Sequence, residues 1–132
     1  MPKPAVSVFP YQQDARGQLF PVVLVKLTSG KKSVDAYGLI DSGATISIFR
    51  SEVADALGID IETGTQIYLG GVGGHIRGYR HDLKIEVAGK KFVCPMVFSR
   101  EYLVSFNLLG REAVFEQFRI IFEEKKNFLK LE

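Results

Sequence analysis

Alternating hydrophobic and polar positions run through most of the chain and predict β-strands. Residues 22–27 are apolar and rich in β-branched side chains, and residues 33–40 follow them after a turn that contains Gly30. In residues 83–87 apolar side chains alternate with charged ones, as they do in a half-buried strand. In residues 92–98 every second side chain is apolar, which places Phe92, Cys94, Met96 and Phe98 on one face.

Both ends of the chain and two short internal segments complete the pattern. Residues 1–19 predict an N-terminal arm or loop, whereas residues 118–132 predict two C-terminal strands around a charged turn. Apolar residues at helical spacing predict short helices over residues 51–57 and 111–118. Many short strands with two small helices indicate a single, mostly β domain over residues 1–132, with a closed or sandwiched sheet.

Composition and charge narrow the classes of function. The chain of 132 residues is 46% hydrophobic, and its formal net charge of +2 comes from 17 basic and 15 acidic residues. The basic residues are not clustered, so we expect no nucleic-acid partner. No apolar stretch predicts a signal peptide or a membrane span, and the single cysteine excludes an internal disulfide, so we expect a reducing cytoplasm and no membrane partner.

The segment from Asp41 to Thr45 carries the most informative chemistry. It reads Asp41-Ser42-Gly43-Ala44-Thr45 and lies between two apolar runs. Asp-Ser-Gly is also common in ordinary turns, so the segment proves little by itself. A carboxylate, a hydroxyl and a glycine between apolar runs is nevertheless an unusual place for a solvated turn.

Two later segments make the first one more informative. Four glycines surround one apolar residue in Gly70-Gly71-Val72-Gly73-Gly74, between two stretches that resemble strands. Glycine tolerates positive φ and leaves the backbone unobstructed, so such a hairpin tip can lie close over a ligand. The second segment, Leu108-Leu109-Gly110-Arg111, precedes the second expected helix.

In this order, the three motifs resemble those of the retropepsins, which are single-domain aspartic peptidases of retroviruses and their cellular relatives. The resemblance extends from about residue 20 to about residue 122. It implies a closed, retropepsin-like acid-protease β-barrel that forms one half of a homodimeric aspartic endopeptidase.

The resemblance also implies the roles of the residues. Asp41 is the catalytic aspartate, and Ser42 and Gly43 support the pair of aspartates. Substrate peptide is bound by the loop and by the glycine-rich flap, which implies contacts from Gly43, Ala44, Thr45, Gly70, Gly71, Val72, Gly73 and Gly74. Leu109, Gly110 and Arg111 form a structural turn.

Peptide hydrolysis by two carboxyl groups explains why a second chain is expected. One carboxylate takes a proton from water while a protonated partner polarises the scissile carbonyl, so no metal or other cofactor is expected. The sequence contains one such motif, so the second Asp41 must come from an identical chain across a two-fold axis.

The chain departs from the family pattern at two places. Viral retropepsins carry an aspartate at the position of Thr45, which pairs with the arginine of the later turn. Arg111 therefore lacks its expected partner. Viral chains also end about one strand after the second helix, so the added C-terminal hairpin leaves the mode of dimerisation open.

Other interpretations of the sequence remain. A retropepsin-like module could bind peptides or dimerise without cleaving, and an oligomerising β domain is a third possibility. The glycine segment fails the dinucleotide fingerprint because Ile76 stands where its last glycine belongs. His75 and His81 lack a third metal ligand, and Cys94 is more typical of a buried structural thiol than of a nucleophile. Tyr68 and Tyr79 flank the glycines. Packing on a strand face is the preferred interpretation of both, and contact with substrate is the alternative.

Overall fold

The computed structural model describes residues 6–71 and 74–132, so Val72 and Gly73 of the expected flap lie outside the described residues. Most of the described chain is in strands, and the mostly β architecture predicted from the sequence is confirmed. The strands are β1 (Ser7–Pro10), β2 (Gln12–Gln13), β3 (Leu19–Phe20), β4 (Val22–Ser29), β5 (Lys32–Ile40), β6 (Ser47–Arg50), β7 (Thr65–Gly71), β8 (Gly74–Val87), β9 (Lys90–Ser99), β10 (Asn107–Leu109), β11 (Ile120–Glu123) and β12 (Phe128–Leu131).

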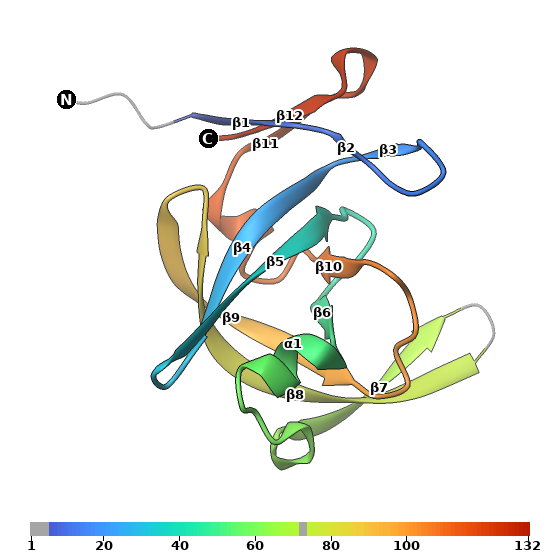
Figure 1. The fold of residues 1–132 in the computed structure, drawn as a ribbon, viewed down its shortest axis with the longest axis vertical. Coiled ribbons are helices and arrows are strands. Elements are labelled where there is room, and N and C mark those ends of the chain that lie inside the picture. The colour runs from blue at the N-terminus through green and yellow to red at the C-terminus, as the bar shows by residue number, and fades with distance from the viewer. Residues whose placement is uncertain (1–5, 72–73) are drawn as a thin grey trace.

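Seven of these strands form one strongly curved sheet. Its order is β4-β5-β10-β6-β9-β8-β7, and an additional pairing of β4 with β8 turns the order into a barrel-like ring (Figure 1). Alternate side chains of β4 and β8 face the inside of this ring, where Val23, Val25, Leu27 and Val87 are fully buried. The apolar alternation in the sequence therefore fixes which face of each strand turns inward.

The face of β9 predicted from the sequence is also confirmed. Cys94, Met96 and Phe98 are fully buried, and Phe92 packs against the same core from a partly buried position. Burial of the Cys94 side chain raises the pKa of its thiol to about 11, so the group stays protonated at neutral pH. This cysteine is a core residue.

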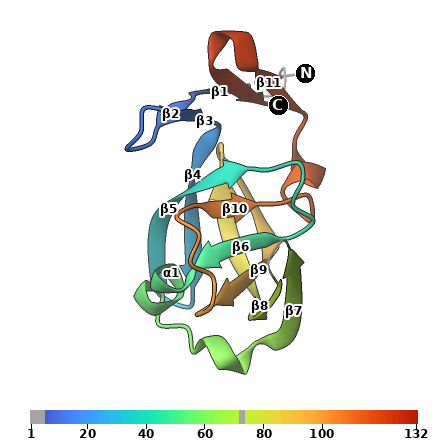
Figure 2. The ribbon, with the colours of Figure 1, turned by 90° about the vertical axis from the view of Figure 1, so that its right-hand side faces the viewer.

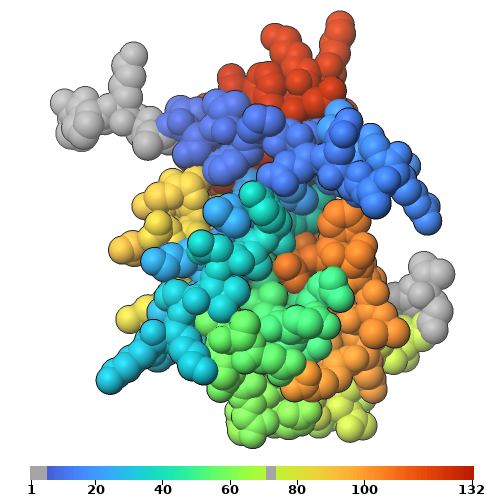
Figure 3. Space-filling model, in the orientation of Figure 1, coloured from blue at the N-terminus to red at the C-terminus, as the bar shows by residue number. Residues whose placement is uncertain are grey.

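A second, three-stranded sheet joins the two ends of the chain, in the order β1-β12-β11. It lies over one end of the ring, where blue and red segments meet in all three views (Figures 1, 2 and 3). Strands β11 and β12 are the expected C-terminal pair. Residues 1–19 were expected to form an arm or loop, but the described part of this segment supplies β1, β2 and the first residue of β3.

Of the two expected helices, only the first is an α-helix, α1 (Ser51–Ala56). In the second segment the backbone turns irregularly and then forms a three-residue 3-10 helix, Phe115–Gln117. Ala113 has a φ of 67°, in the left-handed region that interrupts a right-handed helix. The apolar spacing in that segment instead buries Val114. Two further 3-10 helices cover Ile61–Thr63 and Glu124–Lys126, and none of the helices in the described ranges is long and apolar enough to cross a membrane.

Candidate active site

The position of the loop that begins with Asp41 follows from the order of the strands in the sheet. Strands β5 and β6 are consecutive in the sequence, but β10 lies between them, parallel to β5 and antiparallel to β6 (Figure 2). The connection from Asp41 to Ile46 must therefore cross the end of β10. Main-chain hydrogen bonds fasten it there, from the Asp41 N–H to the Leu109 carbonyl at 3.1 Å and from the Arg111 N–H to the Ala44 carbonyl at 2.8 Å.

Gly110 allows the two segments to cross at close range. A Cβ atom at this position would collide with the backbone carbonyl of Ile46 and would lie 2.8 Å from the Ala44 oxygen. The Gly110 N–H donates a hydrogen bond to Oγ of Ser47, which is fully buried, at 3.0 Å. The expected structural turn at Leu109, Gly110 and Arg111 therefore supports the Asp41 loop directly.

The Asp41 side chain is half-buried at the start of this loop. Its Oδ1 accepts a hydrogen bond from the Gly43 N–H at 2.9 Å, which closes a tight turn typical of Asp followed by Ser-Gly. No other hydrogen bond to this carboxylate occurs among the described residues. Ser42 and Gly43 are exposed beside it.

A cavity of about 670 Å³ lies between the Asp41 loop and the β7–β8 hairpin. Gly43, Ala44 and Thr45 line one side, and Gly70 and Gly74 of the hairpin line another. Asp41 begins the loop that forms the first side, although its own side chain is not part of the lining. Apolar side chains make up most of the remaining surface, namely Ile46, Ile48, Ile67, Leu69, Ile76, Val104 and Leu108. The structure thus brings together all three motifs that the sequence singles out, because Leu108 of the third motif also lines the cavity.

Glycines dominate the end of the hairpin. Gly71 and Gly74 face each other as the last described pair, and Gly70 lies opposite His75. Tyr68 also lines the cavity but remains 66% exposed, in contrast with its expected packing on a strand face.

Tyr102 is a cavity residue that the sequence pattern did not indicate. It lies in the loop between β9 and β10, which contributes orange atoms to the surface in Figure 3. Its hydroxyl donates a hydrogen bond to the Phe106 carbonyl at 2.6 Å. Burial, and secondly the negative charge of Asp41, raise the pKa of Tyr102 to about 12, so this side chain is neutral at physiological pH. A single tyrosine in an irregular loop carries no periodic signal that could have marked it.

The remaining polar candidates have structural contacts. His81 Nε2 forms a hydrogen bond with the Ile61 carbonyl at 2.8 Å, and its ring lies against Phe98. Arg111 contributes its backbone N–H to the crossing, and the described residues include no ion pair to its side chain. Within residues 6–71 and 74–132, no group of three His, Cys, Asp or Glu side chains is arranged to hold a metal ion.

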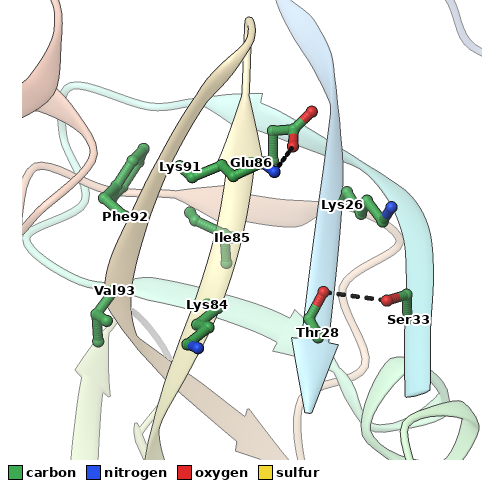
Figure 4. A pocket seen from close by; sticks show the side chains of 9 residues that line it. All are labelled: Lys26, Thr28, Ser33, Lys84, Ile85, Glu86, Lys91, Phe92 and Val93. Carbon is green, nitrogen blue, oxygen red and sulfur yellow. Dashed lines mark hydrogen bonds and ion pairs between the residues drawn. The ribbon is translucent and has the colours of Figure 1, made fainter. Parts of the chain in front are cut away.

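A second hollow lies over β4, β5, β8 and β9, and none of its lining residues belongs to the Asp41 loop (Figure 4). Its charges alternate across the strands, with Lys26 opposite both Asp35 and Glu86, and Glu86 opposite Lys91. The Lys91 Nζ lies 3.7 Å from the Glu86 carboxylate. Such cross-strand pairs stabilise an exposed sheet face, so this hollow has a sufficient structural explanation.

Comparison with known proteins agrees with this geometry. A family model described as aspartyl protease matches residues 25–113. A retropepsin-like aspartic protease from Rickettsia conorii superimposes with a TM-score of 0.72 at 18% identity, over 98% of this chain and 100% of that one. EIAV protease, in a complex with the inhibitor HBY-793, gives a TM-score of 0.55 at 21% identity, over 70% of this chain and 82% of that one. The search of curated proteins found no match. These findings confirm the resemblance and the retropepsin-like fold.

Proposed function

The chain belongs to the aspartyl protease family, and on that premise we propose that it is an aspartic endopeptidase whose active form is a homodimer. The observation that carries this proposal is the setting of Asp41. One chain places a single carboxylate, with one hydrogen bond from Gly43, at the start of the loop that lines a largely apolar cavity. One chain therefore supplies half of a two-carboxylate site, and a second copy supplies the other half.

In the proposed reaction, the two Asp41 carboxyl groups share one proton. Two carboxylates a few ångströms apart cannot both ionise easily, so the pair titrates as a unit. The ionised carboxylate takes a proton from a water molecule, whose oxygen attacks the carbonyl carbon of the substrate. The protonated carboxyl group donates a hydrogen bond to the carbonyl oxygen, and a proton passes to the leaving nitrogen as the C–N bond breaks.

The surrounding residues support the binding of an extended peptide. Gly43 and the hairpin residues Gly70 and Gly74 present backbone without side chains toward the cavity, so a peptide main chain can approach closely. In this proposal Ala44 and Thr45 flank the bound peptide, and the β7–β8 hairpin covers it. Ser42 supports the paired carboxylates from its exposed position next to Asp41.

The direct test is cleavage of an unfolded protein such as casein by the wild-type protein and by Asp41→Asn. We expect Asp41→Asn to lose activity by at least a thousandfold, because the amide keeps the size of the side chain but cannot relay a proton. Its circular dichroism and thermal unfolding should remain close to wild type. Pepstatin-type inhibitors should inhibit the parent.

Asp35→Asn is a matched control, since Asp35 is an exposed aspartate on β5, the strand that leads into the Asp41 loop, and lies opposite Lys26. It should retain full activity. Cleavage by Asp41→Asn at a rate near that of wild type would exclude the aspartic mechanism. A wild-type protein that binds peptides at this cavity without cleaving them would favour the alternative, a catalytically silent binding or dimerisation module.

A further inference from the structure

The β7–β8 hairpin leaves the ring at a defined point. The pairing of β8 with β9 runs from Val87 opposite Lys90 to Tyr79 opposite Phe98, and the described pairing ends there. Toward its tip, β8 is paired with β7 alone, through Gly74 opposite Gly71. Gly78, the next residue beyond the last pair, is buried, and a Cβ atom there would lie 2.7 Å from Val97 Cγ1. The hairpin is thus tightly seated at its base and extends from the ring beyond it (Figure 1).

At Arg77, where β8 is no longer paired with β9, the side chains of Glu101 and Ser99 form hydrogen bonds with the main chain instead. The Arg77 N–H donates a hydrogen bond to Glu101 Oε2 at 2.6 Å, while its carbonyl accepts one from the Ser99 hydroxyl at 2.5 Å. The Ser99 Oγ also accepts a hydrogen bond from the Glu101 N–H at 3.1 Å. These three residues form a closed set of hydrogen bonds, which we call the Ser99–Glu101 clamp.

The hairpin is internally braced above this clamp. The β7–β8 ladder runs from Thr65 opposite Arg80 to Gly71 opposite Gly74. Tyr68 lies opposite Arg77 in this ladder, so the two strands are joined at the residue that the clamp holds. A change at the clamp should therefore shift the hairpin as one unit.

The clamp also connects two sides of the cavity. Glu101 immediately precedes Tyr102, which lines the cavity together with Val104 from the same loop. Tyr68 and Ile76 line it from the hairpin. The exposed Glu101 carboxylate and the buried Ser99 hydroxyl thus both join the hairpin to the segment that leads into this loop.

We propose that Glu101 is a positioning residue that fixes the position of the β7–β8 hairpin over the cavity. Ser99 is the buried member of the clamp. A charge-assisted hydrogen bond from a backbone N–H to a carboxylate is among the stronger non-covalent contacts in proteins. Because Glu101 is exposed, water can replace it at low cost when the hairpin must open. The effect on turnover rests on the proposed function, whereas the effect on the hairpin does not.

Hydrogen exchange measured by mass spectrometry tests the clamp without any assay of activity. We expect Glu101→Ala to accelerate exchange in peptides that cover residues 65–78 by roughly tenfold, the factor expected for loss of one such hydrogen bond. Exchange in β4, β5 and β9 should stay unchanged. Glu101→Gln retains an acceptor oxygen and should restore most of the protection, and Glu62→Ala, an exposed acid in the 3-10 helix Ile61–Thr63, should match wild type.

Cleavage kinetics of the same variants then connect the clamp to the site. Glu101→Ala should raise KM several-fold with a smaller change in kcat, and Glu101→Gln should recover most of the loss. Unchanged exchange of the hairpin in Glu101→Ala would overturn the proposal, as would acceleration spread evenly over the whole ring. Accelerated exchange in a protein that never cleaves peptides would leave the clamp intact and reject the proposed function.

Discussion

At the scale of single residues, the hydroxyl groups of two serines are buried and form hydrogen bonds at the ends of strands. Among the described residues, Ser47 and Ser99 are the fully buried polar side chains, and both lie where a strand ladder gives way to irregular backbone near the cavity. Ser47 accepts a hydrogen bond from Gly110 where β10 passes under the Asp41 loop. Ser99 donates one to Arg77 where the hairpin leaves the ring. Each hydroxyl satisfies a peptide group that the sheet leaves unpaired.

This arrangement predicts the effect of removing Ser47. We expect Ser47→Ala to lower the free energy of unfolding by about 1–3 kcal/mol, because the buried Gly110 N–H loses its acceptor. Urea denaturation measures this change. Ser33→Ala is a suitable control because the Ser33 hydroxyl, 3.1 Å from Thr28 Oγ1, lies on the exposed face, and its loss should change stability by less than about 0.5 kcal/mol. Equal stability of the two variants would contradict this account of the crossing.

Sequence reasoning could identify some of these residues but not others. The Asp41-to-Thr45 segment, the paired glycines and Gly110 stand out because their residue types are unusual between apolar runs. Ser47, Ser99, Glu101 and Tyr102 are ordinary residue types at ordinary spacing. Their importance arises from contacts between segments that are distant in the chain, such as Ser47 with Gly110, 63 positions away. The pattern of residue types along the sequence does not indicate which distant segments come into contact.

At the scale of elements, the long strands were predictable, whereas the short strands and the irregular segments were not. The apolar run of β4, the alternation in residues 83–87 of β8 and the apolar face of β9 follow from burial against the core, so they are visible in the sequence. Residues 111–118 do not form the expected helix because Ala113 adopts a positive φ. An alanine in the sequence does not indicate that conformation. Strand β1 was missed because only alternate side chains of this four-residue strand are partly covered. The contacts that hold β1 come from its pairing with β12, which the sequence of β1 alone does not indicate.

The contact between β1 and the C-terminal hairpin predicts a dependence of stability on alkaline pH. The Tyr11 hydroxyl, next to β1, donates a hydrogen bond to Glu124 at 2.8 Å. Burial and this carboxylate raise the pKa of Tyr11 to about 12 from an ordinary value of 10.0. The folded state therefore holds the proton more tightly than the unfolded state. The resulting stabilisation is present below about pH 10 and declines as the pH rises toward 12.

Tyr11→Phe removes that contribution and isolates it from other groups. We expect the stability difference between wild type and Tyr11→Phe to be largest near pH 8 and to shrink between pH 10 and pH 12. Urea denaturation across this range measures it, and Tyr37→Phe, an exposed tyrosine on β5, is the control. A difference that stays constant with pH would show that the Tyr11 proton does not contribute.

At the scale of the whole molecule, the proposed shared site predicts how mixed chains behave. Wild-type protein mixed with an equal amount of Asp41→Asn should form random dimers, of which about a quarter contain two intact chains. If both carboxyl groups are required, total activity falls to about half of that of the wild-type chains alone.

The mixing experiment requires concentrations at which sedimentation shows dimers and enough time for chains to exchange. Asp35→Asn added in the same amount serves as the control and should not reduce activity. Activity that is unaffected by Asp41→Asn under these conditions would show that each chain works by itself.

The crossing of β10 between β5 and β6 also bears on the order of events during synthesis. Asp41 and Ala44 depend on Leu109 and Arg111 for their long-range backbone partners. A nascent chain that has not yet extended past residue 111 lacks those partners, although its β4–β5 hairpin is already complete. Contacts between distant segments form slowly because a long loop must first close. The Asp41 loop can thus reach its final setting only after residue 111 has left the ribosome.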